Sequence, residues 1–128
     1  MSDLSIPLRR LLDESAIRNV IARFADAAIR ADYDAFRSVW AVDANWTIGT
    51  PPKAQAHGVD DIVALYKRLR SNKDFFVQFA LPGVIDIDGD TATASCVCYE
   101  AARGGATVFY RTSPFTGDGF DLPPAPVA

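Results

Sequence analysis

The sequence has few of the residues that build metal centres, disulfide frameworks and acid–base sites. It has two cysteines and one histidine among 128 residues. Cys96 and Cys98 stand two apart in a strand-like run, so their side chains share a face, and a disulfide between such close positions would strain the backbone. A metal or redox site would need further ligands, which one distant histidine does not supply. We therefore interpret both cysteines as small core residues and expect no metal and no cofactor.

An excess of positive charge and long apolar runs are also absent. Lys and Arg number 13 against 16 Asp and Glu, which gives a net charge of −3. Such a chain does not attract phosphate backbones or anionic membranes. No run approaches the roughly 20 apolar residues of a membrane span, and Met1 to Pro7 shows no signal-peptide pattern. We expect a cytoplasmic protein that binds neither nucleic acid nor membranes.

The composition present is that of a folded domain, with 49% hydrophobic and 23% charged residues. This length and balance predict one domain over residues 1–128. We expect helices and sheet in residues 1–111 and an irregular, proline-rich tail in residues 112–128.

Apolar residues at helical spacing dominate the first third of the chain. Asp13 is the expected cap of a long helix, preceded by a separate helical turn from Pro7 to Leu12. Asp32 is the expected cap of a shorter helix, and Val59 to Leu69 forms another. The buried stripe of the long helix comprises Ile17, Val20, Ile21, Phe24 and Ala28.

Strand patterns follow. A short strand is expected around Trp46, then a loop from Thr50 to Gly58, where prolines break regular structure. Beyond the third helix the pattern predicts an antiparallel meander. Its parts are a strand Phe75–Asp88 bulged at Pro82-Gly83, a turn at Asp88-Gly89-Asp90, and strands Thr91–Tyr99 and Ala106–Tyr110. Helices followed by antiparallel strands define an α+β fold.

Several segments together resemble the SnoaL-like domains of the nuclear transport factor two-like superfamily. The resemblance rests on Ala16-Ile17, Arg23-Phe24-Ala25, Ala31–Phe36, Trp40–Trp46, His57-Gly58 and Ile87–Ala92. It implies a cone-shaped, curved antiparallel sheet packed against about three helices, with an apolar pocket. Its relatives include polyketide cyclases, scytalone dehydratase, ketosteroid isomerase and hexachlorocyclohexane dehydrochlorinase, so the fold alone does not give the activity.

The acid–base pairs of these relatives have no counterpart here. By the resemblance, the Asp–His pair of the dehydratase and dehydrochlorinase branch falls on Ile29 and Gln78. The Tyr–Asp pair of the isomerase branch falls on Phe24 and Ile48. None of these side chains abstracts a proton near neutral pH, so the catalytic residues stay unknown.

The family also implies a further hairpin before the segment Thr112–Gly117. On the order of 30 residues, about two strands, are missing at that point. Their loss would expose a sheet edge and apolar surface, so we expect either a homodimer that covers them or a marginally stable fold.

Three polar residues could serve a site or have only a structural role. Asp26 is expected to pair with Arg23 or Arg30, and His57 to be a surface loop residue. Gln78 is either a buried amide satisfied by backbone or a contact for a ligand. The expected ligand pocket consists of Phe24, Ala28, Ile29, Trp46, Ile48, Gln78 and Tyr99.

Three hypotheses follow. The first is a domain that binds a small hydrophobic ligand without turnover. The second is a lyase, isomerase or cyclase acting on a hydrophobic cyclic substrate, which requires a titratable group on the inner face. The third is a dimeric assembly or interaction module.

Overall fold

The chain forms an α+β structure of helices packed on antiparallel sheets, as expected. The computed structural model describes residues 4–49, 53–104, 107–115 and 117–120. These contain three helices, which are α1 (Ser5–Arg30), α2 (Tyr33–Ser38) and α3 (Val59–Ser71). The strands are β1 (Trp40–Ile48), β2 (Ala54–His57), β3 (Phe75–Asp88), β4 (Thr91–Gly104), β5 (Thr107–Phe115) and β6 (Gly117–Phe120).

The helix α1 begins earlier than expected, at Ser5 instead of after Asp13. Pro7 stands in the first turn, where its missing N–H would have no helical partner in any case. The helix therefore runs unbroken through the turn expected as separate. Asp13 is an interior residue that pairs with Arg9 at 3.4 Å and caps nothing, so that prediction was wrong.

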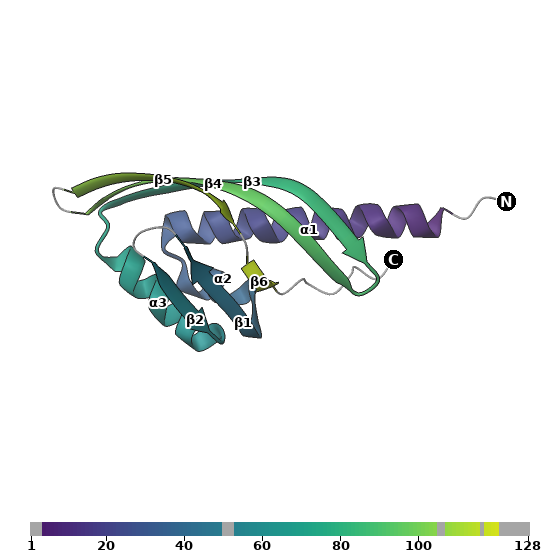
Figure 1. Cartoon of the computed structure of the whole chain (residues 1–128), viewed down its shortest axis with the longest axis horizontal. Helices are drawn as coiled ribbons and strands as arrows, with labels where there is room; N and C mark the ends of the chain where they lie inside the picture. The colour runs from purple at the N-terminus through teal and green to yellow at the C-terminus, as the bar shows by residue number, and fades with distance from the viewer. Residues whose placement is uncertain (1–3, 50–52, 105–106, 116, 121–128) are drawn as a thin grey trace.

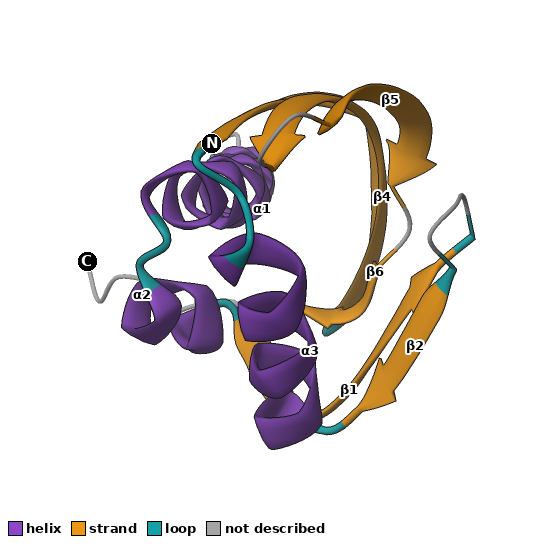
Figure 2. Cartoon of the chain, turned by 90° about the vertical axis from the view of Figure 1, so that its left-hand side faces the viewer, coloured by secondary structure: helices purple, strands orange, loops and turns teal. Residues whose placement is uncertain are grey.

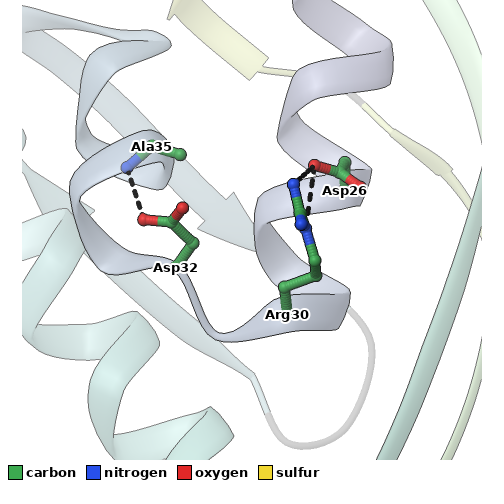
Figure 3. Close-up of polar contacts among 4 residues, drawn as sticks. All are labelled: Asp26, Arg30, Asp32 and Ala35. Carbon is green, nitrogen blue, oxygen red and sulfur yellow. Dashed lines mark hydrogen bonds and ion pairs between the residues drawn. The ribbon is translucent and has the colours of Figure 1, made fainter.

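The end of α1 and the start of α2 form a tight corner. Ala31 adopts the left-handed conformation, with φ 54°, and the amide of Asp32 donates back to the Ala27 carbonyl at 3.0 Å. The Asp32 side chain then accepts from the Ala35 amide at 3.0 Å, which confirms it as the cap of α2 (Figure 3).

The strands form two antiparallel sheets rather than one. One sheet has the order β2-β1-β6 and the other β3-β4-β5. The strands β3, β4 and β5 arch over α1, while β1 and β2 lie beside α3 (Figure 1). Seen along α1, the helices gather on one side and the long strands curve around the other (Figure 2).

Two expectations about irregular segments were wrong. Within the expected loop Thr50–Gly58, Ala54–His57 is strand β2, which pairs with β1. In the expected irregular tail, Thr112–Phe115 belongs to β5 and Gly117–Phe120 is β6, paired with β1. Both segments have weak strand patterns of their own and become strands through pairing with distant residues. Residues 121–128 lie outside the described part of the chain.

The long hairpin forms with the predicted strand β3, turn and bulge, but β4 runs on to Gly104 instead of ending at Tyr99. Gly89, with φ 59°, occupies the turn in a conformation that favours glycine. The register shifts between Pro82 and Ile85, at the expected bulge.

Side chains along this hairpin alternate between an inner face toward α1 and an outer face. The inner face carries Phe76, Gln78, Ala80, Cys96, Cys98, Glu100 and Ala102, all buried or partly buried. On the outer face most side chains are exposed, Phe79 and Val97 among them. The sheet therefore has one side packed on the helices and one apolar side without described cover.

Two core clusters hold the layers together. The larger joins α1, α2, α3 and β1 around Phe36, which is fully buried and stacks on Tyr66 at 4.2 Å between ring centroids. The smaller joins Ile17 and Ile21 of α1 to Ile85, Cys96 and Cys98. Both cysteines are free and buried, which confirms them as core residues.

Within the described residues, no helix combines the length and apolar character needed to cross a bilayer.

The corner at Ala31 provides a stability prediction. The left-handed conformation raises the free energy of a residue with a Cβ by about 1 kcal/mol or more, whereas glycine carries no such penalty. We expect Ala31→Gly to raise the free energy of unfolding by about 1 kcal/mol in urea denaturation.

A matched control is Ala22→Gly, at an exposed position inside α1. The same substitution there should lower the free energy of unfolding by about 1 kcal/mol. Equal losses for both variants would contradict the role assigned to the corner.

Candidate functional site

A polar pair lies on the inner face of the long hairpin. Gln78 of β3 and Glu100 of β4 are direct partners in the antiparallel register, so their side chains point to the same face. The Gln78 Nε2 donates to the Glu100 Oε1 at 2.8 Å. Gln78 is only 7% exposed, and Glu100 is partly buried. The pair is thus a polar element inside a largely apolar face.

The carboxylate fixes the orientation of the Gln78 amide. A carboxylate only accepts hydrogen bonds, so the amide N–H must face Glu100 and the amide oxygen must point elsewhere. That oxygen, Oε1, is buried and has no hydrogen-bond donor among the described residues. The sequence left two roles open for Gln78. Because Oε1 has no donor among the described residues, the prediction of a buried amide that the backbone fully satisfies was wrong.

The helix α3 closes the C-terminal end of α1 with two side chains. The Tyr66 hydroxyl donates to the Ala28 carbonyl at 2.6 Å, and the Arg70 Nε donates to the same oxygen at 3.1 Å. Arg70 also donates to the carbonyls of Ile29 at 2.9 Å and Lys73 at 3.1 Å. These are carbonyls at helix ends, where the backbone lacks partners and carries partial negative charge.

Arg70 is the last residue of the basic run Lys67-Arg68-Leu69-Arg70 in α3, a run whose composition alone suggests a solvated helix end. Arg70 is partly buried, and its guanidinium lies 5.2 Å from the centroid of the Phe76 ring. A cation at the end of α3 is expected from the helix dipole. The sequence alone does not reveal that Arg70 binds carbonyls of another helix, α1.

The Tyr66 hydroxyl lies in an unusual electrostatic environment. Burial, together with the negative charge of Glu100 and the nearby Tyr33, outweighs the opposing effect of Arg70 and raises the pKa of Tyr66 well above its ordinary value. Tyr66 is therefore a proton donor fixed on a backbone carbonyl, and Glu100 lies close enough to influence it.

The apolar residues expected in the pocket divide between packed and partly exposed positions. Phe24, Ala28 and Trp46 belong to the larger core cluster, and Ile48 packs against it. Ile29 is partly buried at the end of α1. Phe76, two residues before Gln78 on the same strand face, packs against the same cluster. Phe76 thus joins the larger core cluster to the strand face that carries Gln78.

Tyr99 lies on the other face. It is 40% exposed, and its ring stacks on Phe79 at 6.4 Å between centroids. Because neighbouring strand residues point to opposite faces, Tyr99 and Glu100 cannot share one. The structure does not bring Tyr99 together with Gln78.

Two other charged candidates have plain structural roles. Asp26 is exposed and pairs with Arg30 at 3.1 Å, one of the two expected partners (Figure 3). His57 ends strand β2, exposed as expected, but in a strand and not in a loop. Its Nδ1 shares a hydrogen bond with the Asn45 side chain on β1.

The remaining chemistry-bearing groups do not form a metal site. No cluster of three or more His, Cys, Asp or Glu side chains occurs among the described residues. The hydrogen bond between the thiols lowers the pKa of Cys96 and, with burial, raises the pKa of Cys98. An open groove bordered by Arg9, Asp13 and the hairpin turn lies at the far end of α1, away from Gln78.

Glu100 is not among the residues predicted for the site. The signal was present, because the alternation that places Cys96 and Cys98 on one face also places Glu100 there. The same parity assigns Tyr99 to the opposite face. A titratable group therefore does lie on the inner face.

The Tyr66 hydroxyl gives a pH prediction. Since its folded pKa is raised, the unfolded chain releases the tyrosine proton above about pH 10 while the folded chain keeps it. The stability from this group is full below about pH 10 and falls as the pH rises further. We expect Tyr66→Phe to lower the free energy of unfolding by about 1 kcal/mol at neutral pH. We expect the difference in free energy of unfolding between wild type and Tyr66→Phe to narrow between about pH 9.5 and 11 in urea titrations.

The matched control is Tyr99→Phe, which removes a tyrosine hydroxyl from the outer face of the sheet. A gap between wild type and Tyr66→Phe that stays constant across this range would contradict the assignment.

Comparisons with known proteins agree with this architecture. Residues 9–119 match the family model described as a SnoaL-like domain. A crystal structure of an NTF2-like protein with a cystatin-like fold from Novosphingobium aromaticivorans is 30% identical, with a TM-score of 0.72. The match covers 89% of this chain and 77% of that one.

More distant structures share the fold alone. A candidate dehydratase of the NTF2-like family from Streptomyces avermitilis is 20% identical over 86% of this chain and 90% of that one, with a TM-score of 0.63. A hexachlorocyclohexane dehydrochlorinase from Novosphingobium barchaimii is 14% identical over 91% and 99%, with a TM-score of 0.55. No curated protein matches the sequence. By the extent of the family match, the chain belongs to the SnoaL-like domain family of the NTF2-like fold.

Proposed function

We propose that this domain binds a small hydrophobic ligand that carries a hydrogen-bond donor, with Gln78 as its polar contact. The observation that carries the proposal is the buried Gln78 Oε1 without a donor among the described residues. A buried acceptor left unsatisfied lowers stability by about 1–3 kcal/mol. A ligand hydroxyl or N–H would supply the missing hydrogen bond.

The surroundings of the amide support a hydrophobic ligand. Gln78 lies on the same strand face as Phe76 and Ala80, and Phe76 borders the cluster that contains Phe24 and Trp46. Pockets for small molecules typically combine apolar walls with a few fixed polar groups. We place the ligand in a conical pocket between the curved sheet and the helices, with Ala28, Ile29 and Ile48 toward its closed end.

The proposal does not use the acid–base pairs of the family's enzymes. Ile29 and Gln78 replace one pair, and Phe24 and Ile48 replace the other. Binding of a hydroxyl by an oriented amide needs neither.

The experiment compares two ligands with the same naphthalene ring, which differ by one O-methyl group. 2-Naphthol has a hydroxyl donor, whereas 2-methoxynaphthalene has only an acceptor. We expect the wild type to bind 2-naphthol about tenfold more tightly, since one hydrogen bond contributes about 1–1.5 kcal/mol. Calorimetry and ligand-induced shifts in Tm measure this preference.

Gln78→Met keeps the length of the side chain and removes the acceptor, so the preference for 2-naphthol should disappear. Each Tm shift is referred to the ligand-free Tm of the same variant. Gln55→Met, which changes the other glutamine at an exposed position of β2, is the control and should keep the preference. Failure of both naphthalenes to bind the wild type would overturn the proposal.

We further propose that the protein is a homodimer formed through the outer face of β3 and β4. Large apolar side chains there are well exposed, namely Phe75 50%, Phe79 57%, Leu81 65%, Val84 66%, Val97 53% and Tyr99 40%. Monomeric proteins rarely expose a contiguous apolar patch of this kind, and such patches mark interaction sites. A second copy presents the same patch, as a twofold interface requires.

Val97→Lys should convert this dimer to a monomer at low micromolar concentration, because it buries a charge in the interface. The control is Val42→Lys, at a valine of β1 that is 82% exposed and lies on the other sheet. Light scattering after size exclusion distinguishes the two states. A wild type that is already monomeric would contradict the proposal.

The charge and composition support the remaining parts of the proposal. With a net charge of −3, the protein is proposed to act in the cytoplasm on small molecules, without nucleic acid, membrane or cofactor.

A further inference from the structure

We propose that the N-terminal part of α1 is a second self-association surface, on which another copy of this chain packs its own α1 in the antiparallel direction. The surface consists of four leucines, which we call the leucine face: Leu4, Leu8, Leu11 and Leu12. It is separate from the outer face of β3 and β4 and does not depend on a ligand at Gln78. Used together, the two surfaces join two sheet dimers into a tetramer.

The leucine face exposes large apolar side chains. Its four members are between 39% and 70% exposed, without cover from the part of the chain that the structure describes. Figure 1 shows why, because this end of α1 extends past the turn between β3 and β4. An apolar patch of this kind marks an interaction site.

The leucines share one side of α1, which is the side turned away from the core. Their spacing of three and four residues places them in neighbouring turns of one face. Residues three turns further along the helix point in nearly the same direction. Those residues are exposed as well, namely Ser15, Asn19 and Ala22. Folding of a single chain therefore leaves the leucine face uncovered.

The charges beside the leucine face identify a second copy as the occupant. The sequence Arg9-Arg10-Leu11-Leu12-Asp13-Glu14 has two bases, two leucines and two acids in that order. Reversing the chain direction exchanges the bases and the acids. An antiparallel copy centred between Leu11 and Leu12 therefore sets arginines level with carboxylates. A parallel copy would set arginines level with arginines, which is unfavourable.

The ion pairs within α1 show which charges meet across this contact. Arg9 pairs with Asp13 at 3.4 Å, and Arg10 pairs with Glu14 at 3.2 Å. Each pair lies on one side of the helix, since its members are one turn apart. In a twofold antiparallel contact equivalent sides meet, so Arg9 lies beside the partner's Asp13 and Arg10 beside the partner's Glu14. The same surface thus supplies both members of each new pair.

The size of the leucine face predicts a weak contact. Four leucines and their flanking charges are few compared with the roughly 20–30 residues that each partner gives to a standard stable interface. We expect a dissociation constant on the order of 100 μM, as in transient contacts. At low micromolar concentration the leucine face therefore stays unpaired.

The experiment isolates this contact in the variant Val97→Lys, whose sheet face is not expected to associate. Sedimentation equilibrium from about 10 μM to about 1 mM brackets the expected constant and should show monomers that form dimers. Adding Leu11→Lys should weaken this association at least about tenfold, because the twofold contact buries the new charge beside its own counterpart. The wild type, measured in parallel, should form tetramers over the same range.

The matched control is Ile6→Lys, added to the same Val97→Lys variant. Ile6 is also well exposed near the start of α1, but it points in the direction of Ile17, a core residue three turns further along. It therefore lies on the opposite side from the leucine face. This control should leave the dissociation constant unchanged.

Two charge variants test the antiparallel pairing. Arg9→Glu with Arg10→Glu gives an acidic helix, and Asp13→Arg with Glu14→Arg gives a basic one. Each should fail to associate with itself, whereas an equal mixture should associate about as tightly as the parent. Both variants lose the ion pairs within α1 in every sample, so recovery in the mixture reports a contact between chains.

Three results would overturn the inference. The first is absence of self-association up to about 1 mM, tenfold above the expected constant; it would favour a helix of another protein on this face. The second is equal weakening by Leu11→Lys and Ile6→Lys. The third is self-association that persists in both charge variants. Circular dichroism checks the helices of each variant, and Leu8→Lys replaces Leu11→Lys if the latter does not fold.

Discussion

The arrangement of the whole molecule depends on how the C-terminal end of α1 is closed. This helix runs beneath the long strands and ends against α3, where Tyr66 and Arg70 bind its last carbonyls. Carbonyls in the last turn of a helix lack their regular intrahelical donors, so these side-chain hydrogen bonds stabilise that end of α1. The same two side chains link α3 to the larger core cluster, since Tyr66 stacks on Phe36 and Arg70 lies over Phe76. One contact thereby fixes the helices and the start of β3 relative to one another.

The polar pair on the sheet follows from that arrangement. With α1 and α3 held on one side, alternate residues of β3 and β4 face them, and Gln78 and Glu100 are included. The carboxylate orients the amide, and the amide oxygen is left as a buried acceptor. The inner face thus carries a polar pair that is formed across two strands.

Local signals in the sequence predicted local structure well. The cap at Asp32, the turn at Gly89, the bulge after Pro82 and the helix beginning at Val59 each depend on residues close in sequence, and the structure confirms them. The prediction that Asp13 caps α1 was wrong, because this capping residue lies inside a helix that begins earlier, at Ser5. The strands Ala54–His57 and Gly117–Phe120 form by pairing with β1, which no local pattern reveals.

The candidate site shows the same division. Gln78 is buried, as one of its two predicted roles requires, and Phe24 and Ala28 of the expected apolar stripe of α1 are buried as well. Its hydrogen bond to Glu100 spans 22 positions and depends on the register of the hairpin, which the turn and the bulge set together. Tyr99 was misplaced although the two cysteines already defined the parity of its strand. The alternation that begins at Cys96 and Cys98 predicts Glu100, and not Tyr99, on the inner face.

The most direct test of the Gln78 site observes the amide itself. The chain has two glutamines, so carbon-13 labelling of glutamine side chains gives two Cδ resonances, and a Gln55 variant assigns them. We predict that saturating 2-naphthol shifts the Gln78 Cδ resonance, because its oxygen accepts a hydrogen bond, while 2-methoxynaphthalene does not. A Gln78 resonance that stays fixed while 2-naphthol is bound would contradict the account.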